Sequence, residues 1–169
     1  MLIREAKLEG IKLISTDKKH RDMLLYTPFI VSKCRKKSQH SIDKFNQKLF
    51  SAEKIQLYVG GYWNPYAPIE ITFDGEAVYR KWEEMLNGEL ADFKEKLDIS
   101  KSEFISKLIN LNIAKWHRDY VDLTVFDGTQ WELTIYFSGG KRKKYEGSND
   151  FPNEFNDLRV LFNIPFHNK

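Results

Sequence analysis

The stretch DGTQWELTIYFSGGKRKKYEGSNDFPNEFNDLRVLF, from Asp127 to Phe162, decides the fold class. Apolar and polar residues alternate over 131–137, which is the period of a half-buried strand. Ser138-Gly139-Gly140 then interrupts the alternation as a hairpin turn does, and a polar strand follows over 141–146. Pro152 stands where a first helical residue is favoured, and apolar residues then recur at helical spacing. The stretch predicts a β-hairpin followed by a helix, and it contains no catalytic motif.

Strand signals continue on the N-terminal side of this stretch. Alternating apolar residues predict strands over 55–61 and 69–73, and Asp74-Gly75 favours a hairpin whose return strand covers 77–82. The return segment also fits a helical stripe, formed by Val78, Trp82, Met85 and Leu86. Apolar clusters between residues 8 and 31 predict further short strands.

Capping residues and apolar spacing predict helices in the middle of the chain. Ser41 is expected as the N-cap of a helix over 42–50. A second helix is expected after the Asn-Gly step at 87–88, with its apolar positions at Leu90, Phe93 and Leu97. A capping box at Ser100–Glu103 predicts a third helix through Ile109. The order of elements predicts an α+β fold, with a mainly antiparallel sheet and helices packed on one side.

Length and composition bound the class of protein. A chain of 169 residues with 41% hydrophobic residues fits a single domain over 1–169, with a helix-hairpin-helix module over 104–162. No apolar run approaches the roughly 18 residues that span a bilayer, and the start of the chain does not have the pattern of a secretory signal. Cys34 is the one cysteine, so no internal disulfide can form. We therefore expect a cytoplasmic protein that does not contact a membrane.

The segment from about 104 to 162 carries a spaced pattern of aromatic, glycine and turn residues. The pattern consists of Trp116, Tyr120, Asp127-Gly128, Gln130-Trp131-x-Leu133-x-Ile135, Gly139-Gly140, Gly147-Ser148-Asn149, Pro152 and Phe155. It resembles a recurrent, uncharacterised domain of small bacterial and phage proteins. The resemblance implies a small mixed fold and carries over no activity. We expect core positions for Trp116, Trp131, Phe155 and Leu158, a positive φ at Gly147, and a turn capped by Asn149.

Motifs for catalysis or metal binding are not found in the sequence. The histidines His20, His40, His117 and His167 lack zinc-ligand spacing, and the paired glycines lack the residues of a phosphate-binding loop. Cys34 and His40 could form a nucleophile pair, but a lone cysteine beside a basic run is more often incidental. A Mg²⁺-dependent nuclease could use the carboxylates Asp119, Asp122, Asp127 and Glu132, although no lysine completes the site on that strand. We expect no catalytic, cofactor-binding or metal-binding residue.

Three surfaces are candidates for binding. The loop 61–68 contains prolines, which make it rigid, and three large aromatic residues, Tyr62, Trp63 and Tyr66. Aromatic residues of this kind dominate binding hot spots. A basic run contributes Arg35, Lys36 and Lys37, and it belongs to a first third of the chain (1–60) that has 13 basic against 6 acidic residues. On the polar strand, Arg142 and Lys144 face one side, where they could contact phosphate or protect a sheet edge.

These observations favour binding over catalysis. We expect an intracellular protein that docks on another macromolecule, most simply a protein partner. Its small size, its two basic patches and its lack of a catalytic motif suit a phage-type inhibitor of a host defence or nucleic-acid machine, of the anti-CRISPR kind. The first alternative is a nucleic-acid-binding module that uses the basic N-terminal third. The second alternative is the metal-dependent nuclease.

Overall fold

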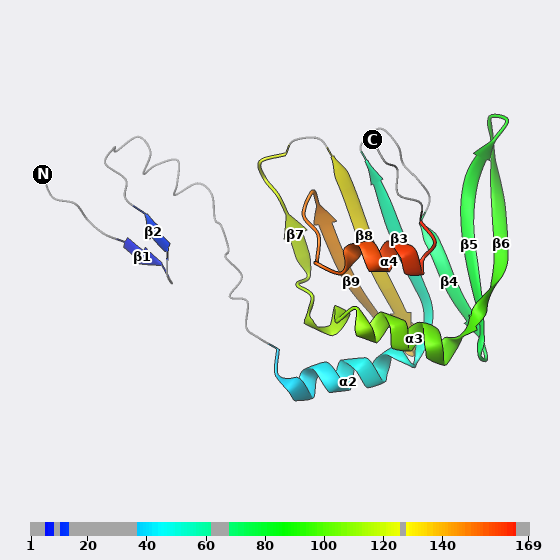
Figure 1. Cartoon of the computed structure of the whole chain (residues 1–169), viewed down its shortest axis with the longest axis horizontal. Coiled ribbons are helices and arrows are strands. Elements are labelled where there is room, and N and C mark those ends of the chain that lie inside the picture. The colour runs from blue at the N-terminus through cyan, green and yellow to red at the C-terminus, as the bar shows by residue number, and fades with distance from the viewer. Residues whose placement is uncertain (1–5, 9–10, 14–36, 62–67, 126–127, 165–169) are drawn as a thin grey trace, which may run out of the picture. The chain divides into compact units, whose positions relative to one another are not determined.

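A computed structural model describes residues 6–8, 11–13, 37–61, 68–125 and 128–164 (Figure 1). The chain divides into two compact units, Met1–Arg35 and Lys36–Lys169. In the first unit, β1 (Ala6–Leu8) pairs antiparallel with β2 (Ile11–Leu13). The remaining residues of the predicted strand region between 8 and 31 lie outside the described residues, and the prediction of a single domain stays a prediction.

The second unit contains a sheet that has seven strands in the described residues, in the order β6-β5-β4-β3-β8-β9-β7 (Figure 1). The strands are β3 (Ala52–Gly61), β4 (Ile69–Asp74), β5 (Ala77–Leu86), β6 (Glu89–Ser100), β7 (Asp119–Val121), β8 (Thr129–Phe137) and β9 (Arg142–Ser148). Neighbouring strands are antiparallel, except that β7 and β9 are parallel. The predicted hairpins at Asp74-Gly75 and 138–140 are both confirmed, as is the α+β class.

The helices α3 (Lys101–Asn110) and α4 (Phe155–Leu161) lie over one face of this sheet, and α2 (Gln39–Leu49) lies beyond its lower end (Figure 1). Short 3-10 turns are formed by η1 (Ile113–Lys115) and η2 (Ser138–Gly140). Phe104 of α3 packs edge-on against Phe73 of β4, with ring centroids 6.0 Å apart. Phe155 of α4 lies 4.9 Å from Trp131 of β8. Trp131 is 2% exposed, and the predicted core positions of Trp116, Phe155 and Leu158 are likewise confirmed.

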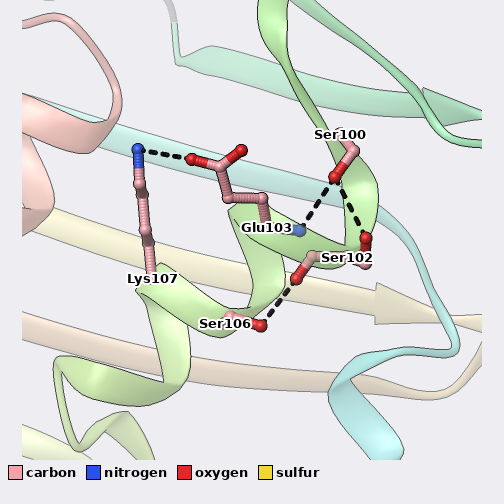
Figure 2. Close-up of polar contacts among 5 residues, drawn as sticks. All are labelled: Ser100, Ser102, Glu103, Ser106 and Lys107. Atoms are coloured by element: carbon pink, nitrogen blue, oxygen red, sulfur yellow. Dashed lines mark hydrogen bonds and ion pairs between the residues drawn. The ribbon is translucent and has the colours of Figure 1, made fainter.

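The start of α3 is fixed by a group of serines where β6 ends (Figure 2). Ser100 Oγ accepts the backbone N–H of Glu103 at 3.1 Å, as the predicted N-cap requires. The Glu103 carboxylate pairs with Lys107 at 3.1 Å. Ser106 Oγ donates to the carbonyl of Ser102 at 2.7 Å. Because the serine cap satisfies a backbone donor, β6 can pass directly into a helix without a loop.

One predicted helix is a strand. Leu90, Phe93 and Leu97 lie on β6, which pairs with β5 along its whole length. Asn87 and Gly88 have φ values of 53° and 88°, as the two central residues of a primed hairpin turn do. Phe93 and Leu97 face the helix-covered side together, whereas Leu90 faces the other side. The helical spacing is therefore a coincidence, and the turn chemistry of Asn-Gly is the stronger signal.

Three local predictions also need correction. Ser38, not Ser41, is the N-cap of α2, and its Oγ accepts the N–H of Ser41 at 3.3 Å. Pro152 is not the first helical residue, because α4 begins at Phe155. Gly147 does not have a positive φ. It has to be glycine because a methyl group there would overlap the indole of Trp131.

Candidate functional site

Strand direction brings distant parts of the chain to one end of the sheet. The strands β3, β5, β7 and β9 run toward this end, and β4, β6 and β8 begin there. It is the upper end in Figure 1. Nine large apolar side chains are exposed in the described residues, and seven of them lie at this end. We call these seven the apolar end: Met85, Leu86, Leu90, Val121, Leu123, Val125 and Phe151.

The β5–β6 hairpin contributes three members of the apolar end. Met85 and Leu90 are a cross-strand pair next to the turn, and each is 62% exposed. Below them, Trp82 stacks on Phe93 with ring centroids 5.2 Å apart. Arg80 lies against Trp82, 4.3 Å from the ring, and bonds to Glu95 and to the carbonyl of Asn163, each at 3.1 Å. The base of the hairpin is therefore stiff, and its tip presents apolar side chains to solvent.

The segment after β7 contributes the second group. Asp122 accepts hydrogen bonds from the N–H and the hydroxyl of Thr124 at 2.9 and 2.7 Å, and these bonds lower the pKa of its carboxyl. Asn149 has the left-handed φ of 59°, and its side chain donates to the carbonyl of Val125 at 3.2 Å, so it holds this segment instead of only the expected turn at 147–150. These bonds fix the backbone while Val121 and Leu123 stay 55% and 62% exposed.

The predicted aromatic loop connects to the same end. Tyr62, Trp63 and Tyr66 lie outside the described residues, so their role as partner contacts stays a prediction. The chain leaves the sheet at Gly61, where β3 ends, and returns at Ile69, where β4 begins. Both anchor points belong to the end of the sheet that carries the exposed apolar side chains.

The predicted basic patches have different surroundings. Arg35 and Lys36 lie outside the described residues. The Lys37 ammonium donates to the carbonyls of Ala114 and Trp116 at 2.6 and 2.9 Å. Burial lowers the pKa of Lys37, as does the neighbouring charge of Lys143. Lys37 thus holds the start of the second unit to the 3-10 turn η1.

Arg142 and Lys144 lie on the sheet face opposite the helices, which we call the open face. Lys144 binds the carboxylates of Glu132 and Glu146 at 2.8 and 2.7 Å, and these bonds raise the pKa of its ammonium. β7 pairs with β9 only from Glu146 to Ser148. The earlier part of β9, which carries Arg142 and Lys144, therefore has no strand on its outer side in the described structure. Lys144 is therefore already neutralised, and its position is the one that edge protection requires.

The pairing register places six basic and seven acidic residues of the described strands on the open face. They are Lys54, Lys81, Lys94, Lys96, Arg142 and Lys144, with Glu70, Asp74, Glu83, Asp92, Asp119, Glu132 and Glu146. The two signs nearly balance, whereas an electrostatic footprint for nucleic acid needs a predominantly basic face. This arrangement does not favour phosphate binding on the open face.

The acidic residues do not assemble as a metal site in the described part of the chain. Asp119, Glu132 and Glu146 line a depression of about 450 Å³ on the open face. Lys144 binds two of these carboxylates, and no group of three potential ligands among the described residues could hold a metal ion. Asp122 bonds to Thr124, and Asp127 lies outside the described residues.

Comparisons with known proteins give no match to a family model, to a curated protein or to a solved structure. In the described residues, no helix has both the length and the apolar character needed to cross a bilayer. The function is therefore inferred from the geometry of the chain.

Proposed function

We propose that this chain is a non-catalytic protein-binding module that docks on a partner through the apolar end of the sheet. The observation that carries the proposal is that seven of the nine exposed large apolar side chains of the described residues lie at one end of the sheet, three of them together at the tip of the β5–β6 hairpin and the others toward the opposite edge. Single exposed apolar residues are ordinary on a protein surface, whereas a contiguous apolar patch, such as the one at the hairpin tip, marks an interaction site. Three sequence segments that are far apart contribute to the apolar end, which local sequence composition does not explain.

The stiffness of the surface supports this role. The aromatic stack below the hairpin tip and the Asp122–Thr124 and Asn149–Val125 bonds hold the backbone of the exposed segments. Binding through a held surface orders few new groups, so less conformational entropy opposes association. We further propose that Tyr62, Trp63 and Tyr66 extend this surface, since their loop is anchored at the same end.

The finer identity that we propose is a cytoplasmic inhibitor of phage type, acting on a host defence or nucleic-acid machine. It rests on the small size of the chain, on the resemblance of residues 104–162 to domains of small bacterial and phage proteins, and on a docking surface with no catalytic motif beside it in the described residues. The target is a protein component, because the open face has nearly balanced charge.

The test is affinity capture from native cells with wild type, Met85→Lys and Leu123→Lys, followed by mass spectrometry. We expect each variant to weaken partner capture by about thirty-fold, since truncating an interface anchor typically loses about 2 kcal/mol. The control is Val160→Lys on α4, because Val160 is 63% exposed but lies outside the apolar end. All four proteins should melt within about two degrees of one another.

Equal capture by wild type and both apolar-end variants would refute the proposal. Trp63→Ala tests the loop separately, and loss of capture with an unchanged melting temperature is the expected result. Sub-micromolar binding to DNA or RNA at physiological salt, lost on changing Arg35, Lys36 and Lys37 to Ala, would instead support the nucleic-acid-binding alternative.

A further inference from the structure

The two edges of the sheet differ in a way that points to a second copy of this chain. At one edge, β7 has only three residues, and the uncovered part of β9 carries consecutive basic residues over 142–144. Short strands and like charges are the usual protection against edge-to-edge pairing. At the other edge, β6 has twelve residues, and no other described strand pairs with its outer side. β6 carries charges of both signs, including Asp92, Lys94, Glu95 and Lys96, so it does not repel a copy of itself as a strand of one sign does.

The turn of the β5–β6 hairpin determines which groups of β6 face outward. Leu86 and Glu89 flank the two-residue turn, so they exchange backbone hydrogen bonds with each other. Because the pattern alternates, Phe93 also bonds to β5, whereas the N–H and C=O of Asp92 and Lys94 point away from the sheet. The outward residues at 90, 92, 94 and 96 therefore supply a row of donors and acceptors for another strand.

We propose that two copies of the chain pair antiparallel through β6, with Phe93 opposite itself on the two-fold axis. In this register Asp92 lies opposite Lys94 of the second copy, and the symmetry repeats the pair. Leu90 faces Lys96 across the interface, and Ala91 faces Glu95. No like charges lie opposite each other. The two sheets would become one continuous sheet, and of the apolar end only Leu90 lies on the strand that forms this interface.

Neighbouring registers are less favourable because they oppose like charges. Moving the axis to Lys94 places the two Lys94 residues opposite each other, and moving it to Asp92 does the same for Asp92. An axis at Glu95 sets Lys94 against Lys96 and Glu95 against itself. Like charges directly opposite on a sheet destabilise pairing. Only the register centred on Phe93, among these four, avoids such a pair while burying an aromatic ring.

A charge exchange tests the proposal on the full chain. The variants are Asp92→Lys and Lys94→Asp, and both positions are exposed. Sedimentation equilibrium of each protein alone, up to about 100 μM, gives the dimer dissociation constant. We expect each single variant to raise this constant by about thirty-fold, or about 2 kcal/mol, because two opposite-charge pairs become like-charge pairs.

Mixing the two variants distinguishes strand pairing from a general charge effect. The Asp92→Lys variant has lysine at both positions of the pair, and the Lys94→Asp variant has aspartate at both. Each lysine of one chain would then face an aspartate of the other, so an equimolar mixture should form a heterodimer with wild-type affinity.

The control is Asp98→Lys, which makes the same charge change on the same strand. In the proposed register this position would face the turn at Gly88, so dimerisation should be unchanged. A wild type that remains monomeric, or a mixture that remains monomeric, would overturn the proposal. Equal weakening by Asp98→Lys would overturn the register.

Discussion

Gly147→Ala should destabilise this protein far more than an ordinary glycine-to-alanine change in a strand. Gly147 lies opposite Trp131 on the neighbouring strand. A methyl group at this position would overlap Nε1 and Cε2 of the indole and lie 2.7 Å from the carbonyl oxygen of Asp150. The same indole N–H donates to that carbonyl at 2.8 Å. The added carbon therefore has to displace both partners of a partly buried hydrogen bond.

The loss of stability can be estimated from two terms. Overpacking a close-packed core costs about 1–3 kcal/mol. Leaving the indole N–H and the carbonyl without each other costs about another 1–3 kcal/mol. We expect a total loss of about 2–6 kcal/mol, which is a large part of a typical stability of about 5–15 kcal/mol.

Urea denaturation followed by tryptophan fluorescence measures this loss. The matched control is Gly61→Ala, because among the described residues a methyl group on that strand glycine meets only one backbone oxygen, at the ordinary distance of 3.5 Å. In a Trp131→Phe background, Gly147→Ala should cost less, because the smaller ring gives room for the methyl group. A loss below about 1 kcal/mol, or the same loss in both backgrounds, would refute the reasoning.

Three further predictions concern the core, a helix cap and an ion pair. Trp131→Ala should lose about 3–5 kcal/mol in the same assay, and a melting temperature within about two degrees of wild type would place Trp131 on the surface. Ser100→Ala should lose about 1 kcal/mol by removing the N-cap of α3, whereas Ser106→Ala should lose less, since its hydroxyl bonds within the helix. The hydrogen bond from Lys144 lowers the pKa of Glu146 below its usual value. The ion pair therefore stabilises the folded protein fully above the pKa that Glu146 has in the unfolded chain, and this stabilisation is lost as pH falls through the pKa of Glu146 in the folded protein. An NMR titration should show this low pKa, and Lys144→Met should raise it; an unchanged pKa in the variant would exclude Lys144 as the cause.

Local signals predicted much of the fold. Alternation over 131–137 and the turn residues after it determined one hairpin, and Asp74-Gly75 determined another. Ser100 was identifiable as a cap because its hydroxyl acts on a backbone donor three residues away. Such features depend on neighbours in the sequence, which a pattern can represent.

The predictions from sequence were wrong or incomplete where contacts between distant residues determine the structure. The spacing of Leu90, Phe93 and Leu97 indicated a helix, although Asn87-Gly88 carried the hairpin signal. The requirement for glycine at 147 comes from the indole of Trp131, sixteen positions earlier, whereas the sequence pattern pointed to backbone torsion. The apolar end was not predicted because its members have no common local pattern. They share one end of the sheet only through the directions of the strands, and the strand order places them in groups toward its two edges.

The pairing of β3 with β8 leaves one edge of β3 unpaired in the nascent chain during translation. β3 is complete at Gly61, but its partner is complete only at Phe137, 76 residues later. At about 5–20 residues per second of translation, this edge of β3 stays without its partner for about 4–15 s. Ile55, Leu57 and Val59 are apolar, and a strand of this kind is prone to aggregate while it is unpaired. The charged residues Glu53 and Lys54 at its start, and the two glycines at its end, are suited to limit that association on the ribosome.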